Sequence, residues 1–154
     1  HTLLAGTRYE AAMHVPGPAT RLQALEQVLA QSPRFLPAAV SLGDELFAAG
    51  RGEEAMRRWE TTLRLQPRAV LVERLRSHAS DRPTRDRLRN VLRKLRFGEL
   101  DSDAVRFHVA QLWLDDGDLP HAAAEIAATS ARVQATPAFH LVRARLEEHE
   151  GQFE

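Results

Sequence analysis

The sequence predicts an all-α fold built from repeated pairs of antiparallel helices. The proline and glycine residues that break helices recur with a period near 34: Pro33 and Pro67 are 34 residues apart, and so are Gly117 and Gly151. Between these positions the apolar residues recur every three or four residues, which is the spacing of an amphipathic helix and not of a strand. A fixed period of this length is the sequence signature of a helical repeat architecture.

The segment 35–68 is the clearest repeat. Two apolar stripes with helical spacing flank the turn residue Gly50. The stripe residues are Ala39, Leu42 and Leu46 before the glycine and Ala55, Trp59 and Leu63 after it. This pattern predicts two helices that turn back on one another at Gly50.

The segment 103–136 repeats this pattern around Gly117. The apolar residues at the matching places are Val109, Trp113, Ala122 and Ile126. Asp118 is placed to cap the second helix with its carboxylate, and Pro120 is tolerated in the first turn of that helix. We expect both tryptophans, Trp59 and Trp113, to be mostly buried between helices.

The remaining repeats are less regular. No glycine marks the turn of the segment 69–102, and Arg76 stands where a small residue is expected, so its hairpin is predicted to be splayed or shifted by one residue. The last repeat ends after its first helix and the chain opens with His1, which leads us to expect a fragment of a longer protein. We predict one domain, 1–154, with repeats at 2–34, 35–68, 69–102, 103–136 and, in part, 137–154.

Small residues stand where the helices of each regular pair would cross most closely. These are Gly43 and Ala110 on the first helices, with Ala55 and Ala122 on the second. Their spacing, together with the terminal Pro67, resembles the tetratricopeptide repeat. The resemblance implies a right-handed superhelical solenoid of about four antiparallel hairpins, whose first helices line a concave groove.

Longer segments resemble the lipopolysaccharide assembly protein B type of bacterial repeat protein. They are Arg34-Phe35-Leu36-Pro37-Ala38, Leu42-Gly43-Asp44, Ala55 through Glu60, and Arg106 through Trp113. The resemblance implies a non-catalytic adapter in regulation of the bacterial envelope, facing the cytoplasm and held at the membrane by a segment outside this chain. Members of that family also carry a metal-binding tail rich in cysteine, whereas this chain has no Cys.

The groove positions of the repeats combine apolar anchors with scattered polar groups. Such a surface suits a peptide or an amphipathic helix of a protein partner. The predicted groove residues are Val40, Asp44, Phe47, Arg74, His78, Phe107, Gln111, Leu114, Leu141 and Arg145. The apolar members Phe47, Phe107 and Leu114 are equally compatible with ordinary packing between helices. The carboxylate clamp of chaperone-binding repeat domains needs Lys and Asn where Asp44 and Val40 stand, which excludes that class of partner.

One segment is strongly basic, although the net charge of the chain is zero. Positions 64–98 hold ten Arg and one Lys against three acidic residues, a local net charge of +8. Such a block suits an acidic partner, with Arg85, Arg89 and Arg93 as its exposed face, or it is a solvated helix face without a ligand. Only Phe97 offers a stacking ring near the block, which argues against nucleic acid.

The residues that the sequence lacks exclude several function classes. Without Cys there are no disulfides, thiolate metal sites or cysteine nucleophiles. His121 and Glu125 share a helix face but no third ligand stands at a fixed spacing, so we expect no metal and no cofactor. No phosphate-binding glycine loop or nucleophile elbow is visible, so the chain is predicted not to be an enzyme and to have no catalytic residues.

The hydropathy pattern predicts no membrane insertion of this chain. No apolar run approaches the ~18 residues that span a bilayer. We expect a soluble module in the cytoplasm. The competing structural class is self-association into a homo-oligomer, because uncapped terminal repeats expose apolar surface.

Overall fold

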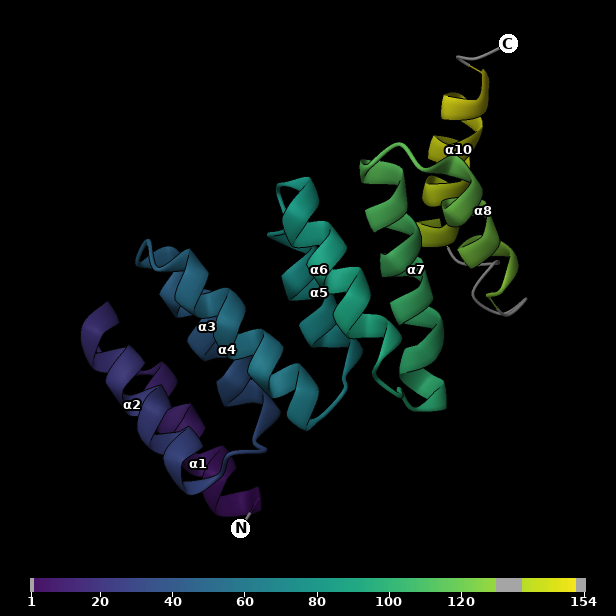
Figure 1. Ribbon diagram of the computed structural model, residues 1–154. Coiled ribbons are helices and arrows are strands. Elements are labelled where there is room, and N and C mark those ends of the chain that lie inside the picture. Colours follow the sequence, from purple (N-terminus) through teal and green to yellow (C-terminus); the bar gives the residue numbers. More distant parts are fainter. Residues whose placement is uncertain (1, 130–136, 152–154) are drawn as a thin grey trace. The chain divides into compact units, whose positions relative to one another are not determined.

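The computed structural model describes residues 2–129 and 137–151, and Figure 1 shows their arrangement into helices. The helices are α1 (Thr2–Met13), α2 (Pro18–Gln31), α3 (Leu36–Ala48), α4 (Gly52–Leu65), α5 (Ala69–Ser77), α6 (Arg82–Arg93), α7 (Glu99–Asp115), α8 (Leu119–Ala127) and α10 (Pro137–Gly151). Helices hold 80% of the described residues, and no strand occurs among them. The all-α prediction is confirmed.

The chain divides into two compact units, His1–Leu71 and Val72–Glu154, which we call the N-terminal half and the C-terminal half. In the N-terminal half α1 packs against α2, α2 against α3 and α3 against α4. In the C-terminal half α6 contacts α7, α7 packs against α8, and α10 packs against both α7 and α8. The prediction of a single domain, 1–154, stays a prediction.

Three glycines form turns of the helix pairs, and two of them, Gly50 and Gly117, stand where the sequence predicted turns. Gly17, Gly50 and Gly117 have φ of 91°, 77° and 73°. These left-handed values are readily adopted only by glycine, which has no Cβ to clash with the backbone. The turns after α3 and α7 are closed alike, because Arg51 N donates to Leu46 O at 2.9 Å and Asp118 N donates to Trp113 O at 2.9 Å.

The α3–α4 hairpin is organised by the approach of a tryptophan to a glycine. A Cβ on Gly43 would lie 2.0 Å from Trp59 Nε1, so the indole occupies the space that a side chain at position 43 would take. Trp59 is 0% exposed, and its Nε1 donates a hydrogen bond to Val40 O at 3.3 Å. Phe47 stacks on the indole with ring centroids 5.8 Å apart. The predicted burial of Trp59 is confirmed.

The α7–α8 hairpin has a different internal arrangement. α7 begins at Glu99, before the predicted start of this repeat at 103, and α8 carries the predicted cap, since Asp118 Oδ1 accepts from His121 N at 3.2 Å. Trp113 is partly exposed and packs against the core of this half, so it is mostly buried as predicted, although less completely than Trp59. Its ring stacks on His121, with centroids 4.4 Å apart, and is covered by a guanidinium from α6.

The α5–α6 segment lacks the close pairing of the other helices. α6 is capped by Asp81, whose Oδ1 accepts from Thr84 N at 2.8 Å. Arg76, at the end of α5, directs its Nε to His108 Nδ1 on α7 at 2.9 Å. A long arginine therefore stands where the regular hairpins have Gly43 or Ala110, and its guanidinium extends to the next first helix.

We expect Gly43→Ala to destabilise the N-terminal half. The added methyl group forces the buried indole of Trp59 to move, and overpacking of this kind costs about 1–3 kcal/mol or more. The free energy of unfolding is to be measured by urea titration, with the helical circular dichroism signal as readout. The same substitution in a Trp59→Ala background should cost much less, because the clashing ring is gone.

Gly6→Ala is the matched control for this prediction. Gly6 lies in α1, and a Cβ there would meet no heavy atom within 4 Å. Because alanine is the better helix former, this variant should be as stable as the wild type or more so. Equal unfolding free energies for Gly43→Ala and Gly6→Ala would contradict the assigned role of Gly43.

Candidate functional site

The predicted groove residues of α3 share one face of that helix. Val40, Asp44 and Phe47 are spaced by four and three residues, which places them in a row. Asp44 is exposed, and Val40 and Phe47 are partly exposed. Two contacts fix the ring of Phe47. It stacks on Trp59, and it lies so close to Gly52 that a Cβ at that position would be 3.2 Å from its Cζ.

The matching row of α7 is shorter than the sequence predicted. Phe107 and Gln111 are partly exposed on one face, and the ring of Phe107 meets that of His108 edge-on at 5.4 Å. Leu114 is only 2% exposed and belongs to the core with Ile126 and other residues of α8 and α10. The prediction that Leu114 contacts a partner is therefore wrong, because α10 packs over this end of α7.

Polar side chains join consecutive first helices within each half. In the N-terminal half the hydroxyl groups of Tyr9 on α1 and Ser41 on α3 lie 2.8 Å apart. In the C-terminal half Arg145 Nη2 on α10 donates to Asp115 Oδ1 on α7 at 2.7 Å, in addition to the bond from α5 to α7. Arg145, one of the predicted groove residues, thus already has a partner, whereas Leu141 of α10 is 74% exposed.

The two other predicted groove residues lie at α5. Arg74 belongs to that helix and His78 follows its last residue, and both are partly exposed. Each makes an interaction within the protein. Leu141 of α10, by contrast, is mostly exposed.

Several hydrogen bonds join segments that lie about one predicted repeat length apart in the sequence. Among the described residues they include bonds between residues that are 32 apart. The pairs are Tyr9 with Ser41, Glu26 with Arg58, Arg34 with Gln66 and Arg76 with His108. Within each half, equivalent helices of consecutive hairpins therefore lie side by side.

The basic segment is largely an internal scaffold. Arg89 is 4% exposed, and its guanidinium donates a hydrogen bond to Leu112 O at 3.1 Å. It also forms ion pairs with Asp86 and Asp116. The guanidinium carbon lies 4.1 Å from the centre of the Trp113 ring. Arg85 is mostly buried against the same Asp116, with Nη2 2.8 Å from Oδ1. The prediction of an exposed basic face is wrong for Arg85 and Arg89, because a buried carboxylate from the α7–α8 turn holds both. Arg93 is exposed and bonds to Asn90.

Two ionisable groups of the C-terminal half are shifted by these contacts. Burial acts to raise the pKa of Asp116, but the hydrogen bonds and charges of Arg85 and Arg89 outweigh it and lower the pKa. Burial, aided by the positive charge of Arg76, lowers the pKa of His108 to about 4. His108 is therefore neutral near pH 7 and accepts the hydrogen bond from Arg76 at Nδ1.

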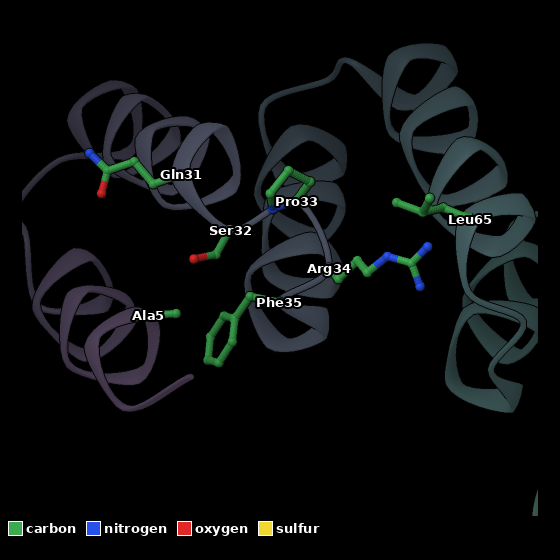
Figure 2. Close-up of a pocket in the computed structure, with 7 residues that line it drawn as sticks. All are labelled: Ala5, Gln31, Ser32, Pro33, Arg34, Phe35 and Leu65. Carbon is green, nitrogen blue, oxygen red and sulfur yellow. The ribbon is translucent and has the colours of Figure 1, made fainter. Parts of the chain in front are cut away.

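A hollow that the sequence did not indicate lies in the N-terminal half, at the turn between α2 and α3. Its volume is about 420 Å³. Its lining residues are Ala5, Gln31, Ser32, Pro33, Arg34, Phe35 and Leu65, drawn in Figure 2. A smaller hollow of about 310 Å³ shares Pro33 and Leu65 with it. No single-repeat pattern could reveal this site, because α1 and α2 of the predicted repeat 2–34 line it together with Phe35 and Leu65 of the predicted repeat 35–68.

Comparisons with protein-family models, with curated proteins and with solved structures find no match to this chain. Within residues 2–129 and 137–151, no cluster of three or more His, Asp or Glu is placed to hold a metal ion. In the same described part, no helix has the length and apolar character needed to cross a membrane. The tetratricopeptide assignment stays a prediction.

We expect the unfolding free energy of the wild type to decrease as the pH is lowered from about 6.5 to about 4, because His108 is protonated in the unfolded chain first. Its pKa is about 4 in the folded protein against 6.5 for the free side chain, so the unfolded chain takes up the proton first as the pH falls. The stability contributed by the neutral ring is complete above pH 6.5 and decreases below it, by at most about 3 kcal/mol.

His108→Gln supplies the comparison, because glutamine offers Arg76 an acceptor that does not titrate. Urea titrations at half-unit pH intervals should give a shallower decline for the variant than for the wild type. Parallel curves across this range would show that His108 is not the group responsible.

Proposed function

We propose that the chain is a non-catalytic protein-binding module that holds a peptide or helix of a partner against its first helices. One observation carries this proposal: hydrogen bonds between residues 32 apart align equivalent helices side by side within each half. That order is what an inner layer of first helices requires in a repeat protein. The resemblance in the sequence points to bacterial envelope and lipopolysaccharide regulation as the setting.

In each half, an aromatic residue of a first helix is suited to act as an anchor. Phe47 is fixed by the ring of Trp59, and Phe107 is fixed by the ring of His108, while each retains exposed surface. A side chain that is already ordered loses little conformational freedom on binding. Rigid aromatic anchors of this kind commonly contribute most of the affinity of an interface.

Polar groups on the same rows can set the register of a bound segment. Asp44 follows Val40 by one helical turn on α3, and Gln111 follows Phe107 by one turn on α7. Both rows therefore place an apolar residue beside a polar one. This alternation suits a partner segment with apolar and polar side chains on the contacting face.

Self-association is the second candidate function, and exposed leucines on the terminal helices favour it. Leu3 on α1 is 91% exposed and Leu141 on α10 is 74% exposed. An acidic partner on the basic segment is a weaker alternative, since Arg85 and Arg89 are engaged with Asp116.

We expect Phe47→Ala to weaken a peptide that binds the row on α3, and Phe107→Ala to weaken a peptide that binds the row on α7, each peptide selected from a displayed random library. Loss of an anchor of ~2 kcal/mol would lower the affinity about 30-fold. Affinity is to be measured by fluorescence anisotropy well below the melting temperature, with the helical signal of each variant recorded. Arg57→Ala, at an exposed position of α4, is the control that should leave binding unchanged.

Selected peptides whose affinity changes with neither phenylalanine substitution would refute the proposed binding rows on α3 and α7. A light-scattering series over protein concentration separates the second candidate function. A monomer without peptide agrees with the proposal, whereas concentration-dependent growth that Leu141→Gln abolishes would favour self-association.

A further inference from the structure

The hollow at the α2–α3 turn is a site distinct from the rows on α3 and α7. Its wall is mainly apolar, with Ala5, Pro33, Phe35 and Leu65 around it (Figure 2). Its volume of about 420 Å³ falls within the range of ~300–1,000 Å³ that is usual for small-ligand sites. One bulky apolar side chain from another molecule would fit inside it.

The wall of this hollow is fixed by hydrogen bonds and ring packing. Ser32 N donates to Val28 O at 2.8 Å, and Phe35 N donates to Ser32 O at 3.0 Å. Gln66 Nε2 donates to Arg34 O at 3.1 Å, which ties the turn to the end of α4. The ring of Phe35 packs edge-on against Tyr9, with centroids 5.7 Å apart. The site is therefore formed before any ligand arrives, and binding needs little rearrangement.

Arg34 is the charged residue of the wall. Its side chain is exposed, and no ion pair or hydrogen bond engages its guanidinium among the described residues. Two arginines of α4 differ in this respect, because Arg58 pairs with Glu26 at 2.6 Å and Arg64 with Glu60 at 2.9 Å. An apolar hollow thus lies beside a guanidinium group that has no ion-pair partner in the part of the chain that the structure describes.

We infer that this hollow binds a short segment of a protein partner in which a bulky apolar side chain stands next to a carboxylate. The apolar side chain enters the hollow, where it is removed from water. The carboxylate pairs with the guanidinium of Arg34, whose two parallel N–H donors match its geometry. The adjoining hollow beyond Pro33 and Leu65 gives the segment room to continue along α2 and α4.

The test uses two capped dipeptides, acetyl-Phe-Glu-amide and acetyl-Phe-Gln-amide, titrated into the ¹⁵N-labelled protein. Both should shift the amide resonances of Ala5, Ser32, Arg34 and Phe35. The glutamate peptide should bind about two- to fivefold more tightly, which is the gain expected of an exposed ion pair. Arg34→Gln should remove this difference, and Arg57→Gln, a matched control on α4, should preserve it.

Ser32→Leu provides an independent check, because a larger side chain at the turn fills the hollow. It should weaken both peptides alike while the helical signal is retained; if that variant does not fold, the Arg34→Gln comparison alone decides. Equal preference for the glutamate peptide in the wild type and Arg34→Gln would overturn the inference. So would shifts confined to Val40, Asp44 and Phe47, or shifts that follow protein concentration without peptide, since a second copy would then occupy the hollow.

Discussion

The N-terminal half depends on the contact between Trp59 and the bare backbone at Gly43. Because position 43 has no Cβ, the indole lies directly against α3 and its Nε1 reaches the carbonyl of Val40. The buried ring then supports Phe47, which stacks on it and presents its remaining surface to solvent. A packing requirement inside one hairpin therefore determines the geometry of the face that we propose for binding.

The C-terminal half reaches a comparable order by a different interaction. There Ala110 takes the place of Gly43. The carboxylate of Asp116, next to the turn residue Gly117, forms ion pairs with both Arg85 and Arg89. Arg89 also covers Trp113, so the ring lies between a guanidinium and His121 at the edge of the apolar core. Removing one partner of such a buried ion pair leaves an uncompensated charge, which is strongly destabilising. The structural ion pairs of Arg85 and Arg89 thus explain part of the high arginine content of this segment, and no basic ligand-binding face is needed to explain them.

Local chemistry was enough to predict the helices and their turns, but not the contacts between repeats. Gly50 and Gly117 need positive φ, and the carboxylate of Asp118 caps the next helix, so a short window of sequence contains the cause of each. Leu114 was misplaced because its burial depends on α10, which no local pattern describes. Arg85 was misplaced because its partner Asp116 is 31 residues away and a count of charges carries no information on pairing. The hollow was missed for the same reason, since Ala5 and Leu65 meet there only after folding.

Hydrogen exchange at the tryptophan indoles tests the central role of Trp59 most directly. The chain has two tryptophans, so a ¹H–¹⁵N spectrum contains two indole N–H signals, which Trp113→Phe assigns. Trp59 is 0% exposed and hydrogen-bonded to Val40 O, whereas Trp113 is partly exposed. In deuterated solvent the Trp59 signal should persist until the N-terminal half unfolds, and the Trp113 signal should be lost earlier. A Trp59 indole that exchanges as fast as that of Trp113 would contradict the account.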